Sequence, residues 1–135
     1  MKYYKIIRDD HIHYNYKFKL GYNFDPRCKN YNLAQKYGFH FAREDILCFI
    51  DCGNWVYQVE TLDDTPINQC EDLDKIEYRA PEIILSNPRP LNLDTIWALV
   101  VEGANIRSCN DFPLILACQK NWIDLVKYLI WQGAN

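Results

Sequence analysis

The sequence lacks any long hydrophobic run and any repeated close pair of cysteines. No stretch approaches the roughly 18 apolar residues that a membrane span needs. The first ten residues hold only a short apolar stretch before Asp9 and Asp10, which does not fit a secretory signal peptide. The six cysteines do not have the spacing of a zinc ribbon or knuckle. We therefore expect reduced thiols, no metal, no membrane partner and a cytoplasmic location without secretion.

Common enzyme motifs are missing as well. The chain has no Ser or Cys nucleophile motif, no P-loop and no dinucleotide-binding glycine pattern. We therefore predict no catalytic residue and no cofactor. Of its 135 residues, 49% are hydrophobic and 15% aromatic. Such a chain can bury a sizeable core, which excludes a disulfide-stapled miniprotein and a disordered tail.

Charge and aromatic residues are distributed unevenly. Residues 1–36 carry eight Lys or Arg and three Asp or Glu, together with six Tyr and two Phe. Basic residues interleaved with aromatics are typical of single-stranded nucleic-acid grooves, with Lys17 and Lys19 as candidate phosphate contacts. However, apolar and polar residues alternate from His11 to Leu20, which indicates a half-buried strand. We favour the strand and a core role for these rings, and nucleic-acid binding is the less favoured alternative.

Residues 1–90 are expected to form an α+β domain of mostly antiparallel strands with one main helix. The acidic segment 60–77 is expected to be a solvated loop or an irregular connection. Asn87–Pro90 is interpreted as a linker, because its two prolines disfavour a continuing helix or central strand. The helix is predicted at 42–50, and the strands are predicted at 3–8, 11–20, 37–41, 55–59 and 78–85, the last interrupted by Pro81.

An internal period of thirty residues marks the last third of the chain. Gly103-Ala-Asn105 recurs as Gly133-Ala-Asn135, and the residues before each copy also correspond. Leu93–Glu102 and its counterpart carry apolar groups at helical spacing and end at glycine, which suits the end of a helix. A period of this length predicts a repeat architecture.

The second copy resembles an ankyrin repeat. The resemblance rests on Phe112–Cys118, then Asn121–Ile130, then the closing Gly-Ala-Asn. Phe112 and Ile115 replace the family's Thr and His, Asn121 replaces its inter-helix Gly, and the segment before Pro113 is shorter than usual. The resemblance implies a fold class in which the α+β domain is followed by ankyrin-type helical repeats over residues 91–135.

A thirty-residue ankyrin period is similar to that of the ankyrin-repeat families of giant DNA viruses. Short motifs in residues 1–90 resemble the N-terminal domain of those proteins, in the same order: 18–23, 38–41, 54–59 and 82–85. The resemblance implies a viral protein that acts in the infected host cell or in the virion.

Ankyrin arrays bind proteins, so the resemblance implies a non-enzymatic protein–protein interaction module with a host or viral partner. The chain stops directly after a helix, with no polar capping repeat. We therefore expect either a chain cut from a longer array or a homodimer through the uncapped repeat. The expected partner-binding residues are Arg107, Asn110, Asp111, Gln119, Lys120, Trp122 and Trp131.

Two other chemistries are less favoured alternatives. The segment Tyr37–Ala42, followed by a helix and then Glu60, resembles the layout of ADP-ribosyltransferases, and such an enzyme would need a cleft that brings His40, Tyr57 and Glu60 together. His11 and His13 could share a metal ion if a third ligand joined them, but two exposed histidines explain the same pattern.

Overall fold

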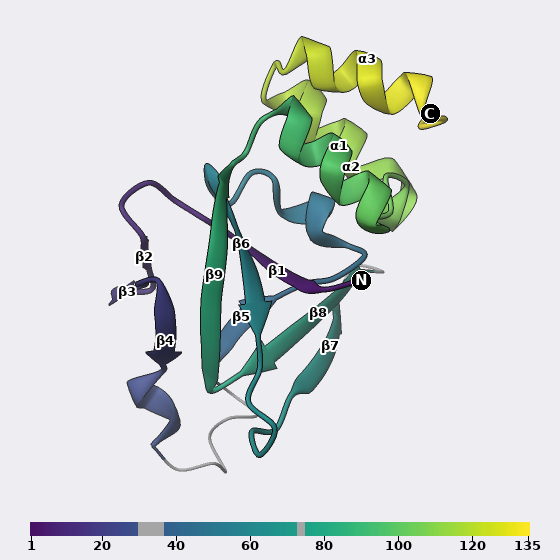
Figure 1. Cartoon of the computed structure of the whole chain (residues 1–135). Helices are drawn as coiled ribbons and strands as arrows, with labels where there is room; N and C mark the ends of the chain where they lie inside the picture. Colours follow the sequence, from purple (N-terminus) through teal and green to yellow (C-terminus); the bar gives the residue numbers. More distant parts are fainter. Residues whose placement is uncertain (30–36, 73–74) are drawn as a thin grey trace.

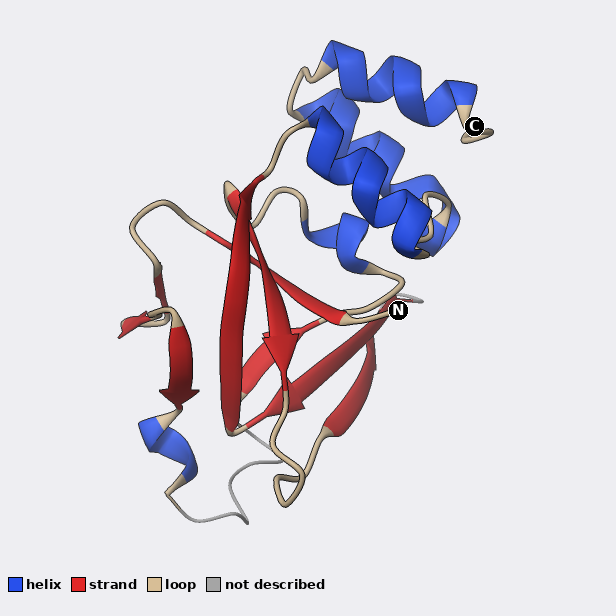
Figure 2. Ribbon diagram, in the orientation of Figure 1, coloured by secondary structure: helices blue, strands red, loops and turns tan. Residues whose placement is uncertain are grey.

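A computed structural model describes residues 1–29, 37–72 and 75–135 of the chain. Over these residues the chain forms nine β-strands and three α-helices, with two short 3-10 helices among the strands. The helices lie together at one end of the molecule, above the strands (Figures 1 and 2).

A four-stranded antiparallel sheet has the order β1-β6-β9-β4. β1 lies along β6, with Lys5 opposite Tyr57. The strands predicted at 3–8 and 55–59 are confirmed as the first two strands of this sheet. The bounds are β1 Tyr3–Ile7, β6 Trp55–Glu60, β9 Glu82–Pro90 and β4 Gly21–Phe24.

A three-stranded antiparallel sheet has the order β5-β8-β7, formed by Phe39–Phe41, Lys75–Ala80 and Asn68–Asp72. The expectation of a solvated loop or an irregular connection at 60–77 is therefore wrong, because part of that segment pairs as β7 and the start of β8. The two sheets meet where Tyr4 and Ala42 form an antiparallel bridge.

The predicted strand His11–Leu20 is wrong, because the segment contains a hairpin. β2 (Ile12–His13) pairs with β3 (Tyr16–Lys17). Between them, Tyr14 and Asn15 have φ angles of 49° and 64°. A two-residue hairpin turn of this kind takes positive φ at both central residues. The chain reverses there, so the alternation in the sequence does not correspond to one face of a continuous strand.

The predicted helix at 42–50 is also wrong. The segment contains only the 3-10 helix η3 (Ile46–Phe49), because Ala42 is held in the bridge to Tyr4. A second 3-10 helix, η1, spans Pro26–Cys28. The expected main helix of residues 1–90 is therefore absent from the described residues.

Asn87–Pro90 is not a linker, because it forms the end of β9. Along this stretch β9 pairs with β6, with Trp55 opposite Pro90, and the register shifts between Val56 and Gln58. The pairing of β9 with β4 ends at Leu85. The two prolines lie beyond Leu85, where, among the described residues, β9 has no partner on the β4 side. Their missing N–H groups therefore cost no hydrogen bond to β4.

The three helices are α1 (Leu93–Glu102), α2 (Ser108–Gln119) and α3 (Ile123–Trp131). The bounds predicted for α1 are confirmed. Gly103 and Gly133 have φ angles of 119° and 106°, as expected for the glycine that ends a helix. The Asn92 side chain accepts a hydrogen bond from the Thr95 N–H at 2.9 Å and caps the start of α1.

The helices share one core with the strands. α1 contributes Ile96 and Leu99, which are fully buried. They belong to one cluster, called core 1 here, with residues of β1, η3, β6, α2 and α3. The remaining buried members of core 1 are Tyr4, Ile6, Ala42, Ile46, Leu47, Ile50, Val56, Ala104, Leu114, Leu116, Ala117, Leu125, Leu129 and Ala134.

The predicted fold class, which ended in ankyrin-type helical repeats, is wrong. The described residues form nine strands in three antiparallel sheets with three helices, and these are not the helical repeats of ankyrin-type proteins. Repeat arrays stack helical pairs mainly on neighbouring pairs. Here the helices bury their apolar faces in core 1 with η3 and β1 as well as against one another.

Candidate functional site

Two of the seven expected contact residues bind each other. Arg107 Nε lies 2.9 Å from Asp111 Oδ1. This carboxyl is largely buried, and its hydrogen bonds with Arg107 lower the pKa of Asp111. Asp111 closes a run of three residues with φ between 55° and 62°, which begins at Cys109. The pair therefore holds a turn at the start of α2, and Arg107 remains half exposed.

The other five contact residues are spread over the helical layer. Asn110 and Gln119 are exposed, whereas Trp122 is half-buried against core 1. Lys120 Nζ donates to the backbone oxygen of Ile50 at 3.3 Å, which ties α2 to the segment after η3. Trp131 at the end of α3 is 79% exposed. Among the seven expected residues, Trp131 is thus a large apolar side chain that remains available to a partner.

Comparison of α1 with α3 across the thirty-residue period identifies further exposed apolar residues on α3. Leu93 and Val100 of α1 are half-buried and pack against core 1. Their counterparts thirty residues later, Ile123 and Ile130 of α3, are 56% and 55% exposed. Equivalent apolar positions are thus covered on α1 and uncovered on α3. Ile123, Ile130 and Trp131 are called the α3 surface below.

The residues of the ADP-ribosyltransferase alternative have separate partners. His40 Nδ1 lies 2.9 Å from Glu77 Oε1. The Tyr57 hydroxyl and His11 Nε2 are 2.7 Å apart, and Glu60 is exposed at the end of β6. The structure does not group Tyr57 and Glu60 with His40 in the cavities that His40 lines.

The residues of the metal and nucleic-acid alternatives are also placed. Within residues 1–29, 37–72 and 75–135, no group of three or more His, Cys, Asp or Glu could hold a metal ion. Lys17 and Lys19 are exposed, as expected. Phe18 is buried, whereas Tyr14 is 74% exposed, so the core role predicted for these rings holds only in part. The six cysteines, all in the described ranges, form no disulfide.

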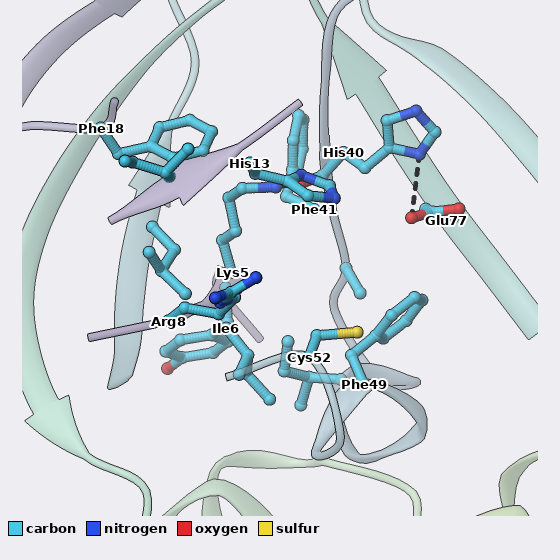
Figure 3. Close-up of a pocket in the computed structure, with 15 residues that line it drawn as sticks. Lys5, Ile6, Arg8, His13, Phe18, His40, Phe41, Phe49, Cys52 and Glu77 are labelled. Carbon is cyan, nitrogen blue, oxygen red and sulfur yellow. Dashed lines mark hydrogen bonds and ion pairs between the residues drawn. The ribbon is translucent and has the colours of Figure 1, made fainter. Parts of the chain in front are cut away.

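A buried lysine lies where the two sheets meet. Lys5 of β1 is 6% exposed, and its Nζ atom donates to the backbone oxygen of His40 at 2.5 Å. It lines a cavity of about 80 Å³, shown in Figure 3 together with the His40–Glu77 ion pair. Burial lowers the pKa of Lys5 to about 8, against an opposing contribution from the Glu77 charge.

Glu77, which also lines the cavity, is kept ionised by its neighbours. Burial by itself would raise the pKa of this carboxyl, but the hydrogen bond and charge of His40, together with the charges of Lys5 and Lys75, outweigh burial and lower it. Sequence reasoning missed both Lys5 and Glu77. The available signal is a lysine inside the otherwise apolar strand Tyr3–Ile7, for which the pattern predicts a strand and no role for Lys5.

None of the helices in the described part of the chain has the length and apolar character of a membrane span.

No family model and no solved structure matches the sequence. A putative ankyrin repeat protein of Acanthamoeba polyphaga mimivirus is 26% identical over 143 aligned residues, which cover 98% of this chain and 41% of the relative. The chain thus spans about two fifths of the length of that relative. It is similar over almost all its residues to a giant-virus protein described as an ankyrin repeat protein.

Proposed function

We propose that the chain is a protein interaction module that acts by binding, without catalysis, in a virus-infected cell. The α3 surface is the observation that carries the proposal. Ile123, Ile130 and Trp131 are 56%, 55% and 79% exposed, although they are large and apolar. Exposed aromatic and aliphatic side chains of this kind are frequent anchors of protein interfaces.

The proposed partner presents an apolar face. Leu93 and Val100 show what fits these positions, because on α1 they pack against core 1, which includes side chains of α2 and α3. Apolar side chains of core 1 therefore cover the positions on α1 that are equivalent to Ile123 and Ile130 on α3. The similarity to a viral ankyrin repeat protein also supports a binding role.

The proposal is tested by quantitative affinity capture from infected cells with the wild type, Ile130→Asp and a control, Val101→Asp. Val101 is 70% exposed on α1, so its substitution adds the same charge outside the α3 surface. We expect the wild type and the control to capture a partner protein that Ile130→Asp does not capture. Identical capture by all three chains would contradict the proposal. Sedimentation of the purified proteins adds a second arm, because a dimer lost only in Ile130→Asp would make a second copy the occupant instead.

A further inference from the structure

The cavity at Lys5 combines an apolar wall with a buried cation. Lys5, Ile6, Phe41 and Ile46 line it and are at least 94% buried, with exposures of 6%, 6%, 3% and 1%. Exposed residues, among them Ile12, also line it, so the cavity opens to solvent. A second cavity of about 210 Å³ shares the walls formed by Lys5, His13, Phe18 and His40. Neither cavity is lined by residues of α1, α2 or α3.

The Lys5 ammonium is incompletely bonded by the described residues. A lysine ammonium can donate three hydrogen bonds. The structure gives it one acceptor, the His40 oxygen, and places its Nζ atom 5.1 Å from the centre of the Phe18 ring. Two donor positions therefore remain for a bound group, and a charge buried with so few partners is costly.

The charges around Lys5 leave this role open to an anion. The charge of Glu77 from β8 acts on Lys5, but its carboxylate pairs with His40 from β5 and makes no hydrogen bond to the ammonium. Arg8 lines the same cavity at the end of β1, with Asp10 at 3.0 Å. Tyr4 of β1, His13 of β2 and Cys52, which follows η3, complete the titratable groups in the wall, and Arg27 lines the second cavity.

We propose that this cavity binds a small carboxylate with an apolar body, which accepts hydrogen bonds from the Lys5 ammonium while its carbon atoms contact Phe41 and Ile46. Charge-assisted hydrogen bonds between an ammonium and a carboxylate are stronger than neutral ones. A volume of about 80 Å³ suits a ligand of a few heavy atoms. This site is independent of the α3 surface, since the two have no residue in common.

Binding is coupled to the protonation of Lys5. With the pKa of Lys5 at about 8, the free protein carries the ammonium below that pH and loses it above. A carboxylate prefers the ammonium form, so its affinity is constant between pH 6.5 and 7.5 and falls up to about tenfold per pH unit above pH 8. Burial, with the Lys5 charge second, lowers the pKa of His13, so this ring is mainly neutral over the same range.

The test titrates the full chain with acetate, propionate and benzoate, and with the corresponding neutral amides, by calorimetry and thermal unfolding. We expect at least one carboxylate to bind saturably and to raise the melting temperature, and its amide to have no effect. Equal responses to acid and amide, or no response to any of the three acids, would overturn the proposal. A carboxylate affinity that does not change between pH 7 and 9.5 would also overturn the proposal.

Two variants locate the site. Lys5→Met should lose carboxylate binding. Lys2 is exposed and directly precedes β1, so Lys2→Met should bind the carboxylate like the wild type. Glu77→Gln removes a negative charge from the wall and should strengthen carboxylate binding several-fold at pH 6.5. Glu77→Gln also tests the assignment of the site if Lys5→Met does not fold. Unchanged binding in Lys5→Met, or unchanged or weaker binding in Glu77→Gln, contradicts the assignment.

Discussion

The Nζ atom of Lys5 in β1 lies 2.5 Å from the backbone oxygen of His40 in β5, so a hydrogen bond from a buried lysine crosses the junction of the two sheets. The bridge between Tyr4 and Ala42 holds the same junction on the backbone side. Because β1 contacts both β6 and the end of β5, four of its five residues are buried and there is no solvated face for Lys5.

The stability of the protein should depend on pH through Lys5. Burial lowers the pKa of Lys5 from 10.5 to about 8, so between these values the unfolded chain holds a proton that the folded chain lacks. The wild type should therefore gain free energy of unfolding relative to Lys5→Met as the pH rises from 8 to 10.5, by up to about 3 kcal/mol. Urea unfolding of both chains at several pH values measures this difference. A constant difference would show that Lys5 is not buried as a cation.

Asp45 should matter for stability because it links three elements. Its Oδ1 atom accepts from the Ser108 hydroxyl at 2.6 Å, and its Oδ2 atom accepts from the Ile76 N–H at 2.6 Å. Asp45→Ala leaves the N–H without this partner and should cost about 2–3 kcal/mol. Asp64→Ala, at an exposed position, is the control and should change the free energy of unfolding by less than about 0.5 kcal/mol. Similar values for the two variants would contradict this role.

The shared core 1 predicts one cooperative unfolding transition. Leu99 of α1 is fully buried in this core, and Leu99→Ala should lower the free energy of unfolding by about 2–5 kcal/mol. Val101→Ala, on the exposed side of the same helix, should change it by less than about 0.5 kcal/mol. Circular dichroism and tryptophan fluorescence should report the same midpoint in each chain. Separate midpoints would show that the helices unfold independently of the sheets.

Asn110 should respond to backbone preference rather than to lost contacts. It is exposed and has a φ of 55°, in the left-handed region that glycine adopts freely and β-branched residues avoid. Asn110→Gly should therefore be nearly neutral, and Asn110→Val should destabilise the protein by about 1–2 kcal/mol. Thermal unfolding compares the two variants with the wild type. Equal melting temperatures would argue against a left-handed turn at the start of α2.

Local signals in the sequence predicted the elements that depend on their own residues. The apolar spacing and closing glycine of Leu93–Glu102 set the limits of α1, because helix bonds and caps lie within a few residues. The strand-forming residues of β1 and β6 were recognised for a similar reason. The seven contact residues follow from the ankyrin resemblance, which does not indicate that Arg107 and Asp111 bind each other.

Only the tertiary structure decided the rest. Ala42 is a bridge residue rather than the start of a helix because Tyr4, far away in the sequence, supplies its partner. Asn87–Pro90 continues β9 because β6 lies on one side of it and β4 ends before it. Lys5 is buried because β6 and the end of β5, both distant in the sequence, lie against β1. The sequence by itself determined where several strands and helices form, but burial and strand pairing are set by distant residues, and they bury the charge of Lys5.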